Sequence, residues 1–157
     1  MRSNICIDSV DPRDKGNSLI ELVVVITIVG ILASFAVPRF APVASDVRAS
    51  EVVALSVNLR NAAAAAHEQY VRSGSTLSSA RLKGRVIQLQ NGYPDAGPQG
   101  IRLAMSDLSD FTTTSTPTSV TYSKIGAPAA ARCAVTYRAS AAASDTATVT
   151  GLDTSGC

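Results

Sequence analysis

The N-terminal third of the chain carries a long hydrophobic run. Residues 22–37 contain no charged side chain, and Leu19, Ile20 and Phe40 extend the run at both ends. As a helix these residues span roughly 24 Å, which is short of the ~30 Å hydrocarbon core of a membrane. The run alone fits a secretory signal, a simple membrane anchor or a buried core helix.

A second pattern, with apolar residues at steps of three or four, follows over residues 42–72 and predicts a helix with one apolar face. That face comprises Val52, Leu55, Leu59, Ala62, Ala66 and Tyr70. Residues 73–75, with Gly74 at their centre, are expected to end the helix. Pro38 and Pro42 each lack a backbone donor, so we expect them to bend or interrupt it.

The remaining residues, 73–157, predict a small antiparallel sheet laid on this helix. Residues 85–90 are typical of a strand, and the following Asn91-Gly92 is a turn signal. Residues 132–138 and 147–152 alternate well enough to be paired strands. The fold class predicted is therefore α+β, with one long helix and a β-sheet head.

Two stretches of the head give weaker signals. Pro98 is expected to open a short helix that carries Ile101, Met105 and Leu108. Residues 112–123 hold nine Ser or Thr residues in twelve and are interpreted as an exposed loop that runs into a strand near Val120.

Composition narrows the function classes. The length of 157 residues fits one domain, and a net charge of +2 does not favour a nucleic-acid partner. His67 is the single histidine, and the three cysteines form no metal-ligand cluster. We therefore expect no metal, no cofactor and no enzymatic activity, because most metal-site and catalytic-triad chemistries lack their parts.

Glu21 is the informative residue of the apolar run. A carboxylate at membrane depth costs about 2–3 kcal/mol and needs a positively charged partner. No Lys or Arg lies on its helix face within one turn. If the chain were cut after Gly16, Asn17 would carry a free α-ammonium four residues earlier, and a neighbouring molecule could offer the same group. The alternative is a simple anchor whose Glu21 reaches the membrane interface.

A secretory signal remains a competing interpretation. Arg13 and Lys15 precede the apolar run, and residues 34–36 end on Ala36 as a small-residue cleavage site. The product would be a soluble exported protein. The acid Glu21 at the mouth of the run, and the helical pattern that continues after Ala36, count against this interpretation.

Residues 15–26, 30–33 and 36–40 resemble the class III signal of type IV pilins and pseudopilins. The resemblance rests on Gly16, on Glu21 five residues later, and on Pro38 after the apolar run. It implies cleavage after Gly16 by the prepilin peptidase and N-methylation of Asn17. It also implies that Glu21 neutralises the terminal amine of an adjacent subunit, and that Pro38 kinks the helix or marks where it melts in a filament.

The same resemblance implies an organisation for the whole chain. A leader (1–16) precedes a hydrophobic polymerisation helix (17–40), the amphipathic half of that helix (41–72) and a globular head (73–157). The implied partners are identical subunits, the prepilin peptidase and the pilus assembly machinery. The implied location is the inner membrane for the precursor, and then a pilus on the surface of a Gram-negative bacterium.

The head has few large apolar side chains, so its core is small and a covalent link would increase its stability. Cys133 and Cys157 can supply a disulfide, because removal of Cys6 with the leader leaves an even number. Type IV pilins close a C-terminal loop with such a bond, which here would span residues 133–157. Secretion-system pseudopilins commonly lack the bond, so it favours a pilin.

Residues 87–94 and 133–157 further resemble the major pilins of mannose-sensitive haemagglutinin (MSHA) pili. This resemblance implies a filament used for adhesion and biofilm formation, with an unknown receptor. The alternatives are a minor pilin or a pseudopilin of type II secretion.

The head gives little sequence evidence for a calcium site or a DNA-binding site. Scattered acids give no calcium-ligand spacing. Alternation of Arg81, Lys83 and Arg85 predicts a charged edge strand rather than a DNA site. His67 is expected on the polar surface. The tyrosines expected to fill the thin core are Tyr93, Tyr122 and Tyr137.

Overall fold

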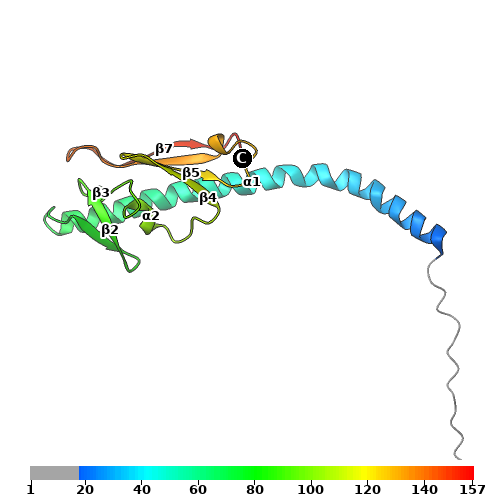
Figure 1. Cartoon of the computed structure of the whole chain (residues 1–157), viewed down its shortest axis with the longest axis horizontal. Coiled ribbons are helices and arrows are strands. Elements are labelled where there is room, and N and C mark those ends of the chain that lie inside the picture. The colour runs from blue at the N-terminus through cyan, green and yellow to red at the C-terminus, as the bar shows by residue number, and fades with distance from the viewer. Residues whose placement is uncertain (1–17) are drawn as a thin grey trace, which may run out of the picture. The chain divides into compact units, whose positions relative to one another are not determined.

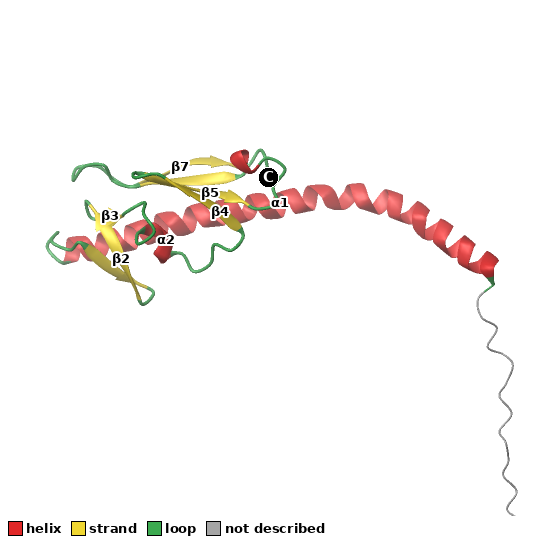
Figure 2. Cartoon of the chain, viewed as in Figure 1, coloured by secondary structure: helices red, strands yellow, loops and turns green. Residues whose placement is uncertain are grey.

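The computed structural model describes residues 18–157, and Gly16 and Asn17 lie outside this range. One long helix, α1 (Leu19–Arg72), precedes a set of short strands (Figures 1 and 2). The chain divides at residue 41 into an N-terminal unit and a larger unit, Pro42–Cys157. Each unit is described separately.

The larger unit contains two antiparallel sheets, so the single sheet predicted for the head is divided into two, while the α+β class is confirmed. The first has the strand order β1-β2-β3 and the second β4-β5-β6-β7. The elements are β1 (Ser79–Leu82), β2 (Arg85–Gln90), β3 (Tyr93–Pro94), α2 (Ile101–Ala104), β4 (Phe111–Ser115), β5 (Ser119–Lys124), the 3-10 turn η1 (Ala130–Arg132), β6 (Ala134–Arg138) and β7 (Thr148–Asp153).

Helix α1 is continuous across Pro38 and Pro42, so neither proline interrupts it. It ends at Arg72, as the sequence predicted. The closing turn is fixed by a hydrogen bond from the Ser75 N–H to the Tyr70 carbonyl, at 3.0 Å. Carbonyl groups at the helix end, which have no partner within the helix, are satisfied in this way.

The predicted strand at residues 85–90 is β2, and the predicted Asn91-Gly92 turn joins it to β3. Lys83, however, does not lie on a strand. It has φ of +49° in the turn between β1 and β2, so Arg81, Lys83 and Arg85 do not share one strand face. The adjacent Gly84 supplies the second left-handed position of a hairpin turn, which period-two alternation cannot reveal.

The Thr-rich stretch is a hairpin rather than a loop. Thr112 to Ser115 belong to β4 and pair with β5 in a regular register, with Thr113 opposite Tyr122. Threonine is β-branched, and its strand preference prevails here over the turn tendency of its hydroxyl.

The predicted helix after Pro98 is only four residues long. Ile101 lies in α2 and is fully buried, whereas Met105 and Leu108 follow the helix. Strands β6 and β7 pair as predicted, with Thr136 opposite Thr150.

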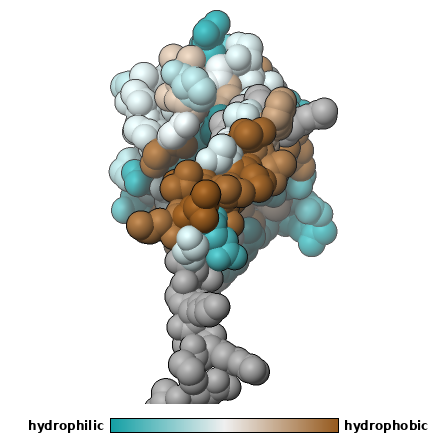
Figure 3. Space-filling model, turned by 90° about the vertical axis from the view of Figure 1, so that its right-hand side faces the viewer, coloured by the Kyte–Doolittle hydropathy of each residue, from teal (hydrophilic) through white to brown (hydrophobic). Residues whose placement is uncertain are grey.

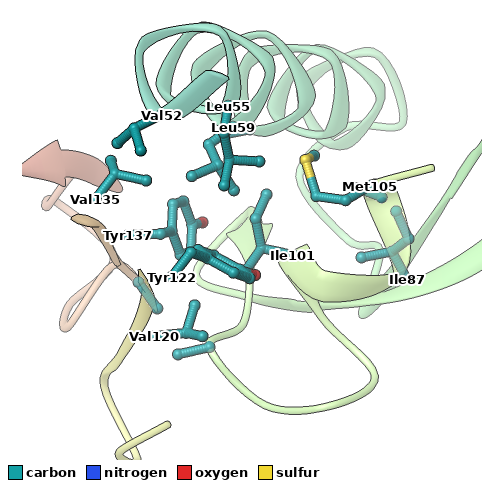
Figure 4. Close-up of a cluster of buried hydrophobic side chains, with 14 of the residues drawn as sticks. Val52, Leu55, Leu59, Ile87, Ile101, Met105, Val120, Tyr122, Val135 and Tyr137 are labelled. Atoms are coloured by element: carbon teal, nitrogen blue, oxygen red, sulfur yellow. The ribbon is translucent and has the colours of Figure 1, made fainter. Parts of the chain in front are cut away.

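The core lies between α1 and both sheets. Val52, Leu55 and Leu59 of the helix face the side chains of Val120, Tyr122, Val135 and Tyr137 from the larger sheet (Figure 4). Ile87, Ile101 and Met105 close the other side of the cluster. Of the predicted helix face, Ala66 is also buried, while Ala62 and Tyr70 are half-buried. Hydrophobic burial on this face therefore holds the sheets against α1.

Candidate assembly site

The part of the N-terminal unit whose side chains the structure describes contains an apolar helical segment that no other part of residues 18–157 covers. Leu19–Ala36 is apolar enough and long enough to cross a membrane, and none of these side chains is buried. Hydrophobic surface, brown in Figure 3, covers the described helix next to the grey segment. So large an exposed apolar surface indicates a region that contacts lipid or other protein chains.

The two hydroxyl groups of this segment are satisfied within its own helix. The Thr27 hydroxyl donates to the Val23 carbonyl at 2.7 Å, and the Ser34 hydroxyl donates to the Ile31 carbonyl at 2.6 Å. At Gly30 an added Cβ would meet no atom within 4 Å, so this side of the helix is open. Small residues of this kind let a second helix approach closely.

Glu21 lies in the first turn of α1 and is exposed. It is the one charged residue of the stretch 18–36. The positive end of the helix dipole favours a carboxylate there. Among residues 18–36 and 43–157 the ion pairs are Arg72–Glu68, Lys124–Glu51 and Lys124–Asp110, so Glu21 has no cationic partner within these two ranges.

A second apolar surface lies on the head-bearing half of α1. Val43, Val47 and Val57 each remain about half exposed. At 100° per residue they lie on the side of the helix opposite Val52 and Leu59, which face the core. Between residues 43 and 57 the helix thus carries exposed valines on the side opposite the core, and only the core side is covered by its own sheets.

The end of the chain is attached to the helix. Cys133 and Cys157 form the implied disulfide, with a Cα–Cα distance of 4.8 Å, and both are buried. The Arg48 Nε of α1 donates a hydrogen bond to the Cys157 carbonyl at 2.5 Å. The disulfide-closed segment is thus anchored directly to α1.

A buried charge forms a second attachment. Lys124 of β5 is almost fully buried, and its Nζ lies 2.6 Å from the Glu51 Oε2 of α1 and 3.5 Å from the Asp110 Oδ2. Burial alone would lower the pKa of Lys124, but the hydrogen bond and negative charge of Glu51, together with Asp110, raise it. Lys124 therefore stays charged and holds the sheet to the helix.

His67 is half-buried instead of lying free on the polar surface. Its ring stacks on Tyr93 with centroids 4.1 Å apart, and its Nδ1 lies 3.1 Å from the Gly92 carbonyl oxygen. Of the predicted core tyrosines, Tyr122 and Tyr137 are fully buried, whereas Tyr93 is half-buried in this stack. Among residues 18–157 no group of three potential metal ligands is found.

Sequence reasoning missed Arg48 and the Glu51–Lys124 pair. Arg48 lies one turn before Val52 on the helix face that packs on the sheets, and a polar residue in an apolar stripe was the available signal. Lys124 gave no such signal, because its partner is distant in sequence.

Comparison with protein families identifies one segment. Residues 11–37 match the family model of the prokaryotic N-terminal methylation motif. The match contains Gly16, Asn17 and Glu21.

Curated relatives extend this similarity into the head. A type IV major fimbrial protein FimA of Dichelobacter nodosus is 30% identical over 125 residues, which are 78% of this chain and 66% of that protein. A second FimA of this organism is 35% identical over 85 residues, 54% of this chain and 41% of that protein. The type IV narrow pilus major component PilA5 of Thermus thermophilus is 44% identical over 57 residues, 36% of this chain and 49% of that protein.

The chain thus spans between 41% and 66% of the length of these curated relatives. No solved structure matches it.

Proposed function

We propose that this chain, which belongs to the type IV pilin family and carries its N-terminal methylation motif, is a structural subunit that polymerises into a pilus filament. The family is one of structural proteins without enzymatic activity. The observation that carries the proposal is the uncovered apolar helix Leu19–Ala36 with its single acid, Glu21, in the first turn.

Polymerisation would bury what the single chain exposes. The apolar side chains of residues 19–36 would leave the membrane and pack against the same segments of other copies. The exposed valines Val43, Val47 and Val57 would continue this packing along the second half of the helix.

Processing would supply the partner of Glu21. Cleavage after Gly16 by a prepilin peptidase exposes the α-amino group of Asn17, which is the proposed site of N-methylation. In the filament this cation would neutralise Glu21 of an adjacent copy, because an unpaired carboxylate in an apolar core is costly. Pro38 is proposed as the position where the helix adapts to this packing.

The experiment compares Gly16→Ala and Glu21→Ala with the unaltered chain. We expect Gly16→Ala to leave only full-length precursor, as measured by intact mass. Glu21→Ala should be cleaved normally, but the yield of sheared filaments should fall by at least roughly tenfold. The reason is that each contact between subunits loses the charge pair of Glu21 with the Asn17 α-amino group.

The matched control is Glu68→Ala, which removes an exposed acid from the same helix outside the apolar segment. It should assemble normally. Abundant filaments from Glu21→Ala would contradict the role of Glu21. A mature protein that begins at Val37 would replace the whole proposal with a soluble exported protein.

The finer function follows from the resemblance of residues 87–94 and 133–157 to MSHA pilins. We place the filament on the surface of a Gram-negative cell, where it would serve adhesion and biofilm formation. A strain that lacks this chain should attach to surfaces less than its complemented strain. Recovery of the chain as the bulk of sheared filaments would distinguish a major pilin from a minor pilin or pseudopilin.

A further inference from the structure

The four edges of the two sheets are not equally protected. Edge strands with free backbone groups tend to pair with other chains, and proteins block them with charge, proline or irregular register. β1 carries Arg81, β3 is two residues long and contains Pro94, and β7 carries Asp153 and has a register shift against β6. β4 (Phe111–Ser115) has none of these features.

The pairing pattern shows which groups of β4 point outward. The Ile125 N–H donates to the Asp110 carbonyl at 3.0 Å, and the Thr116 N–H donates to the Ser119 carbonyl at 2.8 Å. Backbone bonds alternate along an antiparallel pair, so Thr112 and Thr114 also bond to β5. Thr113 and Ser115 then direct both backbone groups away from the sheet, and within residues 18–157 these groups have no hydrogen-bond partner.

We propose that β4 is a docking edge for the same strand of a second copy, in antiparallel orientation about a two-fold axis at Thr113. The two Thr113 residues would exchange two hydrogen bonds. By the same alternation the Phe111 carbonyl also points away from β5. In a pairing centred on Thr113 it lies opposite Ser115 of the other copy, so each Ser115 N–H would donate to the Phe111 carbonyl of the other copy. A two-fold contact uses one surface twice, so this pairing closes.

The side chains of β4 suit this partner. Thr112 of one copy would lie opposite Thr114 of the other on the exposed face of the sheet. Cross-strand threonine pairs are favourable, and no like charges would meet. The same face already holds a row of threonines across the sheet, and the Thr121 and Thr136 hydroxyls lie 2.8 Å apart within it. The row comprises Thr114, Thr121, Thr136 and Thr150.

Figure 1 shows β4 and β7 at opposite sides of the four-stranded sheet, which makes β7 the control edge. The test uses the full chain in detergent, with Cys6→Ser to remove the third cysteine. Thr113→Cys places two thiols at a hydrogen-bonded pair whose Cα atoms would be ~5.5 Å apart, within the range of a disulfide. Under mild oxidation it should give at least ~tenfold more covalent dimer than Thr148→Cys on β7, because paired strands raise the effective thiol concentration.

A second cross-linking experiment tests the same pairing if Thr113→Cys folds poorly. Thr112→Cys and Thr114→Cys alter exposed residues, and a mixture of the two should cross-link. Each alone should not, because identical positions lie diagonally, roughly 8 Å apart, in this register. Equal dimer from Thr148→Cys, or none from Thr113→Cys and from the mixture, would overturn the proposal.

The pairing concerns Pro42–Cys157 alone and does not depend on filament formation. A chain that dimerises through β4 but forms no filaments would refute the proposed function and leave this inference intact. If both hold, β4 would join neighbouring filaments side by side. The double variant T112K/T114K should then separate such filaments, whereas T148K/T150K on the opposite edge should not.

Discussion

Two fully buried tyrosines on neighbouring strands differ in what their hydroxyl groups contact. The Tyr137 hydroxyl donates a hydrogen bond to the Pro94 carbonyl at 2.7 Å and so links the two sheets. The Tyr122 hydroxyl is buried without a hydrogen-bond partner among residues 18–157. Burial raises the pKa of both side chains, that of Tyr122 to about 12.

We therefore expect Tyr137→Phe to lower the free energy of unfolding by about 1–3 kcal/mol at neutral pH, and Tyr122→Phe to be neutral or slightly stabilising. Denaturant titration at pH 7 checks this contrast. A larger loss for Tyr122→Phe than for Tyr137→Phe would contradict the hydrogen-bond assignment.

The same residues predict a dependence on alkaline pH. An unfolded tyrosine ionises near pH ~10, whereas the folded state keeps these two protonated. Above that pH the unfolded state binds fewer protons than the native state, so stability should fall as the pH rises toward 12. Tyr122→Phe should make this decline less steep in unfolding measurements made at increasing pH, and an unchanged slope would count against the raised pKa.

At the scale of elements, the β2–β3 hairpin is fitted against the end of α1. Gly92 has φ of +81° in the hairpin turn, and an added Cβ would lie 2.5 Å from the Tyr70 Cδ1 of the helix. Gly84, in the β1–β2 turn, has nearly the same backbone, with φ of +79°, but no atom within 4 Å of an added Cβ. Alanine at either position would meet the same backbone strain, but only alanine at position 92 would also meet the helix. A comparison of the two variants therefore separates the two effects.

Gly92→Ala should destabilise the chain by about 1–3 kcal/mol more than Gly84→Ala, because only the first must also displace the Tyr70 ring. Thermal unfolding of the two variants measures the difference. Equal losses would show that the hairpin does not press on α1.

The sequence predicted correctly those helices, strands and turns that depend on residues close together in the chain. The apolar run, the amphipathic half of α1, β2 and the Asn91-Gly92 turn all follow from spacing and turn residues. The β4–β5 hairpin was missed because Ser and Thr favour both turns and strands, and only pairing decides between them.

The candidate site divides in the same way. The exposed apolar segment and the position of Glu21 on it could be predicted, because both depend only on the order of residues within a single helix. The division into two sheets and the Glu51–Lys124 pair could not, because they depend on contacts between residues far apart in sequence. The proposed pairing at β4 rests on backbone groups, which the side-chain pattern does not report.

For the molecule as a whole, the disulfide supplements a thin core. The loop closed by Cys133 and Cys157 has a sequence separation of 24 residues. By the loop-entropy model its closure restricts the unfolded chain by about 3.5 kcal/mol.

Cys157→Ser should therefore lower the free energy of unfolding by about 2–5 kcal/mol and make the head sensitive to protease. Timed proteolysis, followed on gels, measures the effect, with Cys6→Ser as the control that leaves the loop closed. Unchanged resistance of Cys157→Ser would show that the apolar core alone is sufficient.

The attachments at Arg48 and Glu51 have a mechanical consequence. Both lie at the start of the stretch of α1 that binds the sheets, so a pull on the N-terminal part of the helix reaches the head there first. Arg48 passes this force to Cys157, and the disulfide passes it to Cys133 beside β6. Such a pull would therefore load the disulfide-closed segment through Arg48, and strand β5 through the Glu51–Lys124 pair, before it reaches the apolar contacts of Val52 and Leu59.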